Sequence, residues 1–237
     1  MGLRQAIATP DGKRRYVGRL FSTIAPRYDL ITVVLSYGCD RRWKRRLISL
    51  ARITPADVVL DLACGTGDLL FAAAREARVA VGLDLTLPML RRAAAKPSRP
   101  STALVAGDML ALPLRAAHFT VVTVGYGLRN TADLDRALDE IDRVLAPGGR
   151  LLSLDFNRPA NPVIRALYLS YLTVVGSVLG LLLHGDPDTY RYIPESIRGY
   201  PGAQGVAGLL EQHGFADVRV EPLLGGLMTI HVAHKPR

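Results

Sequence analysis

The sequence predicts an α/β fold in which a mostly parallel, seven-stranded sheet carries helices on both faces. Short apolar runs of strand type alternate with longer stretches of helical character, which is typical of strand-helix-strand units. The first run ends in an acid and a tight glycine turn, and later runs also end in acids or glycines. With 237 residues, of which 49% are hydrophobic, the chain can bury one substantial core, so we expect a single domain.

The first strand and its turn are the most informative stretch. Val58 to Leu60 predict a buried strand, and Asp61 follows them before the turn that contains Gly65 and Gly67. Glycine lets the backbone take a left-handed conformation and approach a ligand closely. A helix is expected from near Asp68. The third glycine of the dinucleotide fingerprint is missing, so the turn favours a cofactor without a pyrophosphate.

The next strands bring further polar groups to the same edge of the sheet. Strands are predicted over residues 79–83, 103–106, 119–124 and 150–156, the last after the breaker at residues 146–149. Asp84 follows the first of these runs, where a carboxylate can accept hydrogen bonds from both hydroxyls of a ribose. Asp108 follows the second and can accept from an exocyclic amino group, while Met109 packs on a flat ring. Taken alone, each acid can also be a helix cap or a solvated turn residue.

Two helical segments stand apart from this alternation. One helix is predicted at about residues 16–35. Residues 166–183 form a run of eighteen without a formal charge, long enough to be considered as a membrane span. The runs 218–223 and 227–233 predict a hairpin that completes the same sheet, and a crossing would split that core. We therefore interpret residues 166–183 as a buried or interfacial helix that, with the N-terminal helix, lines an apolar cleft.

Charge and cysteine content narrow the partners. The net charge is +9, and the densest basic cluster, residues 41–46, contains Trp43. Peripheral contact with an anionic membrane explains this cluster better than nucleic acid, because Trp43 within it favours the lipid interface and no recognisable nucleic-acid module accompanies it. A solvated helix in a generally basic protein is the alternative. Cys39 and Cys64 are too few for a disulfide framework and lack metal-ligand spacing, so no metal is expected. Without a secretory signal, we expect a cytoplasmic protein, peripheral on the inner face of the cell membrane.

Five further blocks lie at residues 21–29, 35–38 with 42–44, 127–130, 143–149 and 190–198. With these blocks the chain resembles a known family, the quinone-biosynthesis C-methyltransferases among the class I S-adenosylmethionine-dependent methyltransferases. The nearest members of that family act on demethylmenaquinone or on 2-polyprenyl-6-methoxybenzoquinol. The resemblance implies a Rossmann-like fold with S-adenosyl-L-methionine as cofactor. It also implies a helical cap (1–52), a cofactor-binding core (53–160), a helical substrate insertion (161–202), and a C-terminal helix and hairpin (203–237).

The chemistry of that reaction assigns roles to particular residues. A nearby cation would help a ring hydroxyl of the quinol to ionise, and Arg129, just past the fourth strand, is the candidate, with Asn130 orienting the ring. An arginine that only bridges to a nearby acid is the alternative. Tyr190 and Tyr192 are expected to line the ring pocket. His231 is conceivable as a base, although a lone histidine on an apolar strand is more often structural. The predicted cofactor-binding residues are Asp61, Gly65, Thr66, Gly67, Asp84, Asp108, Met109 and Gly125.

The predicted function is methylation of a prenylated quinol carbon, demethylmenaquinol to menaquinol, with ubiquinone-type benzoquinols as further acceptors. Two alternatives stay open. One is another small-molecule methyltransferase with the same cofactor, and the other is a basic protein that binds membrane or nucleic acid and has a vestigial cofactor site. The sequence does not decide between a monomer and a homodimer.

Overall fold

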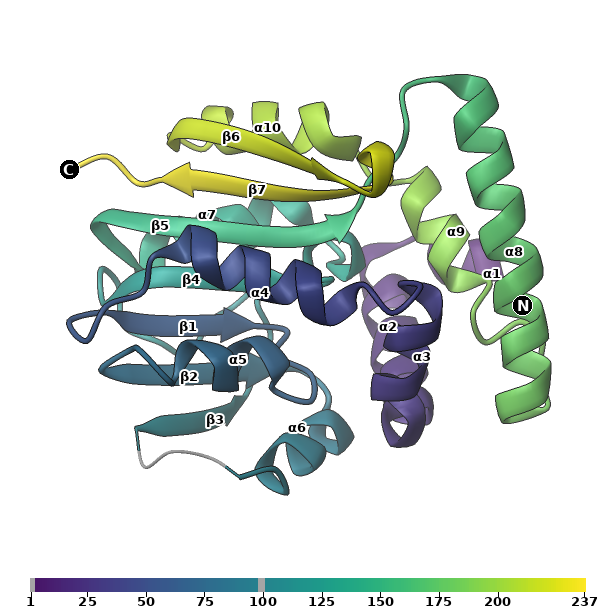
Figure 1. The fold of residues 1–237 in the computed structure, drawn as a ribbon, viewed down its shortest axis with the longest axis horizontal. Helices are drawn as coiled ribbons and strands as arrows, with labels where there is room; N and C mark the ends of the chain where they lie inside the picture. Colours follow the sequence, from purple (N-terminus) through teal and green to yellow (C-terminus); the bar gives the residue numbers. More distant parts are fainter. Residues whose placement is uncertain (1–2, 98–100) are drawn as a thin grey trace.

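The computed structural model describes residues 3–97 and 101–237. A single seven-stranded sheet forms its centre, in the order β3-β2-β1-β4-β5-β7-β6 (Figure 1). Only β7 runs antiparallel to its neighbours β5 and β6, and the other pairs are parallel. The predicted mostly parallel sheet is confirmed. The strands are β1 (Val58–Leu62), β2 (Val79–Asp84), β3 (Thr102–Ala106), β4 (Phe119–Gly125), β5 (Leu145–Phe156), β6 (Ala216–Leu223) and β7 (Met228–His234).

Helices cover both faces of the sheet and one of its ends. They are α1 (Leu3–Ala6), α2 (Pro10–Ile24), α3 (Tyr28–Leu35), α4 (Asp40–Ala51), α5 (Asp68–Ala73), α6 (Leu87–Ala94), α7 (Leu134–Val144), α8 (Pro162–His184), α9 (Tyr192–Arg198) and α10 (Gly202–Gln212). Helices α4 and α5 pack on one face, and α7 and α10 pack on the other. Helices α2, α3, α8 and α9 gather beyond the carboxyl ends of the parallel strands, at the right of Figure 1.

Strand periodicity explains the two cores. Side chains of a strand alternate between faces, so the uninterrupted apolar run of β1 must be covered on both sides. Leu60 and Leu62 pack with Leu138 and Ile141 of α7, whereas Val59 packs on the α4 and α5 side. The sheet is therefore buried on both faces. A ligand can reach it at the carboxyl ends of the strands, which is the usual binding place in open α/β sheets.

The N-terminal segment differs from the single helix expected at residues 16–35. Helix α2 begins earlier, with Thr9 as N-cap accepting from the Gly12 N–H at 3.1 Å. The chain then passes through a 3-10 turn, Ala25–Arg27, before α3 starts. Pro26 lies in that turn, and proline lacks the N–H that a continuous helix would need. The break gives α3 its own direction across the end of the sheet (Figure 1).

The predicted breaker at residues 146–149 lies inside β5 and does not precede it. The strand already begins at Leu145, and the backbone takes the left-handed region at Gly148 with φ +77°. The register with β4 shifts between Phe119 and Val121, so the glycines produce an irregularity within the strand. The ladder is regular from Arg150 onward, where the strand was predicted to start.

Candidate active site

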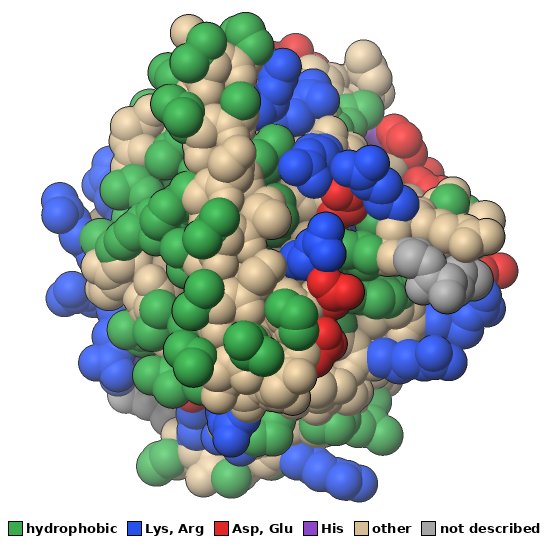
Figure 2. All heavy atoms as spheres, turned by 90° about the vertical axis from the view of Figure 1, so that its right-hand side faces the viewer, with side chains coloured by type: hydrophobic (Ala, Val, Ile, Leu, Met, Phe, Trp, Pro, Cys, Tyr) green, Lys and Arg blue, Asp and Glu red, His purple; other side chains and the backbone are tan. Residues whose placement is uncertain are grey.

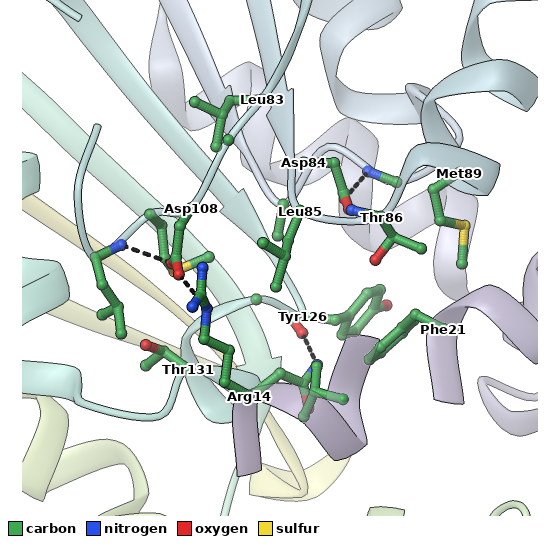
Figure 3. Close-up of a pocket in the computed structure, with 18 of the residues that line it drawn as sticks. Arg14, Phe21, Leu83, Asp84, Leu85, Thr86, Met89, Asp108, Tyr126 and Thr131 are labelled. Atoms are coloured by element: carbon green, nitrogen blue, oxygen red, sulfur yellow. Dashed lines mark hydrogen bonds and ion pairs between the residues drawn. The ribbon is translucent and has the colours of Figure 1, made fainter. Parts of the chain in front are cut away.

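Two cavities lie side by side at the carboxyl edge of the sheet. The first, here the sheet-end cavity, encloses about 750 Å³ and is lined by residues that follow β1, β2, β3 and β4 (Figure 3). The second, the apolar cavity, encloses about 610 Å³ between α2, α3 and the start of α9. Phe21, Tyr28 and Tyr126 line both. Three aromatic side chains thus form the boundary between a site at the sheet and a site under the cap.

Asp84 lies at the end of β2 on the wall of the sheet-end cavity (Figure 3). Its Oδ2 accepts from the Gly65 N–H and its Oδ1 from the Thr86 N–H, both at 2.8 Å. The side chain is buried, and burial raises the pKa of this carboxyl. Each carboxylate oxygen has a second lone pair, so Asp84 can still accept two hydrogen bonds from a vicinal diol.

The glycine turn is held by contacts to the cap as well as to the sheet. Gly65 lines the sheet-end cavity with φ +54°, as its strand-to-helix turn requires. Thr66 donates from Oγ1 to Asp29 Oδ1 of α3 at 2.6 Å and is buried. Gly67 precedes α5 with φ +87° and lines neither cavity. Thr66 and Gly67 therefore shape the turn, and among the three it is Gly65 that faces the sheet-end cavity.

Asp108 and Met109 lie where predicted, on the wall of the sheet-end cavity. Asp108 Oδ1 accepts from the Leu110 N–H at 3.0 Å, and Arg14 Nε lies 2.6 Å from Oδ2. Arg14 comes from α2 and lines the same cavity (Figure 3). The sequence offered no signal for Arg14 beyond a basic residue in a helix, because its partner lies 94 residues away in the chain.

Asp61, at the end of β1, faces a small side cavity that also contains Gly65, Thr66 and Lys44. Its Oδ1 accepts from Thr123 Oγ1 at 2.7 Å. Its Oδ2 is buried and has no hydrogen-bond partner within the described part of the chain. Burial raises the pKa of Asp61 to about 7. An unpartnered carboxylate oxygen beside the glycine turn is suited to receive a cation from a ligand.

Gly125 and Tyr126 close the space between the cavities. Gly125 lines the sheet-end cavity, and a Cβ there would lie 2.8 Å from Leu69 Cδ1. Tyr126 has φ +58°, a strained value for a side chain of its size. Its hydroxyl donates to Asp40 Oδ1 at 2.8 Å, and Lys44 Nζ lies 2.7 Å from Asp40 Oδ2. This buried network fixes the ring between the cavities.

Arg129 and Asn130 lie on opposite sides of the same boundary. Arg129 lines the apolar cavity, and Asn130 lines the sheet-end cavity. Arg129 Nη1 donates to Asn130 Oδ1 at 2.8 Å and to Ser196 Oγ at 2.9 Å. Arg129 Nε donates to Asp155 Oδ1 at 3.1 Å, so the bridge to an acid exists. Arg129 thus uses Nε and Nη1 for contacts within the protein while its side chain lines the apolar cavity.

Tyr190 and Tyr192 both line the apolar cavity and are both buried. The Tyr190 hydroxyl lies 2.8 Å from His184 Nε2. The Tyr192 hydroxyl is buried without a hydrogen-bond partner among the described residues. Burial raises the pKa of Tyr192, so this hydroxyl stays protonated and can donate. Arg129 is the one charged side chain among the described residues that line this cavity.

Three expectations about other residues are wrong or lose their support. Trp43 is buried in the core between α4 and the sheet, so it does not reach a membrane from the basic cluster. Helix α8 contributes no lining residue to the apolar cavity, whose lining comes mainly from α2, α3 and the start of α9 and also includes Trp43. His231 lies on β7, with Nε2 2.9 Å from Ala203 O, and lines neither cavity. This contact supports the structural alternative for His231.

The fold and the paired cavities define a class I S-adenosylmethionine-dependent methyltransferase. A nucleoside that carries an amino acid fits the groups at this site. These groups are the buried carboxylate of Asp61 with its unpartnered oxygen, the glycine turn, and the carboxylate of Asp84 at the end of β2. No group of three or more His, Cys, Asp or Glu side chains suited to a metal ion occurs within residues 3–97 and 101–237.

Comparisons with known proteins give the family. The model of the ubiE/COQ5 methyltransferase family matches residues 9–235, so the chain belongs to this family and is a methyltransferase that uses S-adenosylmethionine. A demethylmenaquinone methyltransferase from Thermus thermophilus is 41% identical over 221 residues, covering 92% of this chain and 100% of the relative. The ubiquinone/menaquinone biosynthesis C-methyltransferase UbiE of Syntrophotalea carbinolica is 40% identical over 216 residues, covering 90% and 91%.

Solved structures agree at the level of the fold. An S-adenosylmethionine-dependent methyltransferase from Mesorhizobium loti has a TM-score of 0.61 at 19% identity, covering 82% of this chain and 98% of its own. A SAM-dependent methyltransferase from Aquifex aeolicus has a TM-score of 0.59 at 16% identity, covering 81% and 88%. The predicted seven-stranded, class I methyltransferase fold is thereby confirmed.

Proposed function

We propose that this methyltransferase acts on a ring carbon of a prenylated quinol and converts demethylmenaquinol to menaquinol. One observation carries the proposal: an apolar cavity adjoins the cofactor site across three aromatic side chains, and Arg129 is the single charged side chain among the described residues that line it. A fused aromatic ring with a hydrocarbon tail matches that lining, since burying each methylene contributes about 0.8 kcal/mol. The names of the relatives agree with this substrate class.

The cofactor is assigned to the sheet-end cavity and its side cavity. Asp84 accepts from the ribose hydroxyls, and Asp61 accepts from the α-ammonium group through its unpartnered Oδ2. Asp108 receives the adenine amino group, and Met109 packs on the ring. Gly65 and Gly125 supply backbone surface without a Cβ. Thr66 and Gly67 act through the shape of the turn and through the bond of Thr66 to α3.

Arg129 is proposed to act on the quinol from the apolar side. The bound cofactor supplies an electrophilic methyl group. An unperturbed phenol has a pKa of about 10, so the substrate hydroxyl needs a donor that favours its ionised form. The Arg129 guanidinium, which lines the apolar cavity, can hold the ionised ring oxygen, while Asp155 fixes the guanidinium through Nε. The ring carbon beside the ionised oxygen would form the bond to the methyl group as the bond from that methyl group to the sulfonium sulfur breaks, and the neutral thioether would be the leaving group. The ring carbon would then lose its proton to solvent water, which restores the aromatic ring.

Asn130, Tyr190 and Tyr192 are proposed to position the ring. Asn130 Nδ2 donates to Tyr126 O at 2.6 Å and Asn130 Oδ1 accepts from Arg129, so both of its polar atoms brace the boundary. It therefore orients the ring through its neighbours. Tyr192 can donate to the second quinol oxygen. Tyr190 is held through its hydroxyl by His184 and offers its ring as an apolar wall.

Benzoquinols are the second candidate substrates, favoured by the dual name of the Syntrophotalea carbinolica relative. The test is methyl transfer from labelled S-adenosylmethionine to reduced demethylmenaquinone and, in parallel, to the matching benzoquinol, with mass analysis of the extracted lipids. Methylated naphthoquinol alone supports the proposed reaction, and both products support a dual-pathway enzyme. Cofactor binding without either product would redirect the assignment to another small-molecule acceptor. The absence of both binding and product would favour a vestigial site.

A further inference from the structure

Helix α8 has two apolar sides, and the protein covers one of them. By length and composition α8 is able to cross a membrane, and 28% of its apolar window is buried. The inner side packs on the protein through Tyr168, Leu169, Leu172, Gly176 and Gly180. The outer side recurs at helical spacing and is exposed, with Leu167 at 68% and Leu182 at 75%. Its members are Val163, Ile164, Leu167, Tyr171, Val174, Val178, Leu181 and Leu182.

Helix α3 extends this exposed surface. Its outward side chains, together with Tyr37 just after the helix, are also exposed: Leu30, Val33, Val34 and Tyr37. Tyr37 stacks on Tyr171 of α8 with ring centroids 5.8 Å apart, which joins the two helices. We call these exposed side chains of α3 and α8 the α3–α8 face. Figure 2 shows hydrophobic side chains gathered along this side of the molecule, with Lys and Arg side chains beside them and at the edges.

We propose that the α3–α8 face docks on the surface of an anionic lipid bilayer. Contiguous apolar patches of this kind are rare on freely soluble proteins and mark interaction sites. A basic protein with an exposed apolar helix matches the interfacial mode of membrane binding, in which apolar side chains enter the boundary and cations stay at the headgroups.

Charge identifies the bilayer as the occupant. Arg165 lies in the first turn of α8. At the other end of the helix, burial lowers the pKa of His184, and the nearby charge of Arg27 lowers it further. Of the acids that follow α8, Asp188 is paired with Arg191 at 2.8 Å, whereas Asp186 accepts from the neutral Thr189 Oγ1 at 3.1 Å and keeps its charge. Cations at both ends of an apolar strip suit acidic headgroups, each contributing about 1 kcal/mol near the surface. A second basic chain on the same strip would bring like charges together.

Docking leaves α8 on the surface and not across the bilayer. A Cβ at Gly176 would lie 3.2 Å from Tyr190 Cβ, so the helix packs closely on the cap. The strands before and after it, β5 and β6, belong to the same sheet, which places both ends of α8 on one side. The helix can therefore present its outer side to lipid while its inner side stays on the protein.

The α3–α8 face also adjoins the apolar cavity. Ile31, Thr32 and Leu35 line that cavity from the inner side of α3, while Val33 and Val34 of the same helix are exposed. One helix thus separates the bilayer from the site. A prenyl tail would pass from the bilayer to the cavity across this helix. That step rests on the proposed function, whereas the docking itself does not.

Vesicle cosedimentation of the full chain, without cofactor or quinol, tests the docking. The triple variant L167Q/V174Q/L182Q changes exposed positions and should keep the folded far-UV spectrum and cofactor affinity. Its partitioning onto phosphatidylglycerol vesicles should fall at least about tenfold. The matched control L87Q/L224Q changes two exposed leucines on other elements and should bind vesicles like the parent chain. Equal binding by the triple variant and the control would overturn the proposal.

Further arms separate the other occupants. R27Q/R165Q should bind phosphatidylglycerol vesicles severalfold more weakly than the parent chain at low salt. At high salt, where the attraction between charges is screened, the variant and the parent chain should bind equally. A shift from dimer to monomer in the triple variant, with no vesicle binding by the parent, would assign the face to a second copy. Resistance of the bound parent chain to alkaline extraction would show a membrane span. Either result would overturn the proposal.

The proposed function is tested separately by turnover of a short-tailed, soluble quinol. If the triple variant turns over this substrate like the parent chain and loses activity only on long-tailed quinol in vesicles, docking and function both stand. If neither chain turns over any quinol while the parent still binds vesicles, the proposed function fails and the docking stands.

Discussion

Asp155, near the end of β5, holds Arg129 by both of its carboxylate oxygens. Oδ1 accepts from Arg129 Nε at 3.1 Å, and Oδ2 accepts from the Arg129 backbone N–H at 3.0 Å. Both side chains are buried, at 5% and 1% exposure. The guanidinium also lies over the Phe156 ring, 4.9 Å from its centroid. The cation is therefore fixed in place on the wall of the apolar cavity.

The first prediction concerns this cation. Arg129→Gln should retain cofactor affinity, because Arg129 does not line the sheet-end cavity, and should lower turnover by about 100-fold, as expected for loss of an oxyanion donor. Calorimetry with S-adenosylmethionine and steady-state methyl transfer measure the two effects. Arg78→Gln, at an exposed arginine just before β2 and at the opposite end of that strand from Asp84, is the control and should change neither.

Removing one partner of a buried pair also costs stability, about 3–5 kcal/mol. The double variant Arg129→Gln/Asp155→Asn removes both charges and should recover part of that free energy of unfolding without recovering turnover. Full turnover in either variant would remove Arg129 from the mechanism and leave it the purely structural role of bridging to Asp155.

The second prediction concerns the end of β2. Asp84→Asn keeps the size of the side chain but loses the charge that strengthens hydrogen bonds from ribose hydroxyls, so cofactor affinity should fall by about 100-fold. The thermal midpoint of the ligand-free protein should also fall, because Nδ2 of asparagine cannot accept one of the two backbone N–H bonds that Asp84 accepts, so affinity is measured well below that midpoint. Asp217→Asn, at an exposed residue of β6, serves as the control. Wild-type affinity of Asp84→Asn in calorimetry would contradict the ribose assignment.

The ends of β1, β2 and β3 were predictable because local patterns determine them. An apolar run followed by an acid places Asp61, Asp84 and Asp108 at one edge of a parallel sheet, whatever the helices do. The contact of Arg14 with Asp108 depends instead on how α2 packs across the end of the sheet. No pattern within α2 specifies that position.

The same reason explains the errors at Trp43 and α8. Within α4, Trp43 is surrounded in sequence by basic residues, yet its helical position turns it toward the core while most of its charged neighbours point outward. For α8, the composition predicts an apolar helix but not which side the protein covers. The cavity walls were assigned to α8 from its composition, whereas α9 and the break at Pro26 place other residues there.

The third prediction uses neighbouring residues on α3. Thr32 faces the apolar cavity, and Val33, at 39% exposure, faces outward. Thr32→Phe should fill part of the cavity and raise KM for the prenylated quinol about tenfold, with cofactor affinity unchanged. Val33→Phe adds a ring outside the cavity and should leave KM unaltered; both variants are measured with the same short-tailed, soluble prenylated quinol. Equal KM values for the two variants would place the quinol elsewhere.

The last prediction follows from the raised pKa of Asp61, about 7 in the folded protein against about 3.9 for an unperturbed aspartate. Between these values the folded chain binds more protons than the unfolded chain, so Asp61 reduces stability as pH rises from about 4 to about 7. Asp61→Asn does not titrate. In urea unfolding without cofactor, the variant should therefore gain about 2 kcal/mol on wild type between about pH 5 and about pH 8.

Cofactor binding should show the opposite preference: the wild-type carboxylate must be ionised to receive the α-ammonium group, so wild-type affinity should rise through pH 7 while that of Asp61→Asn stays weak and flat. Parallel pH profiles for the two proteins would assign the ammonium contact to another group of the side cavity.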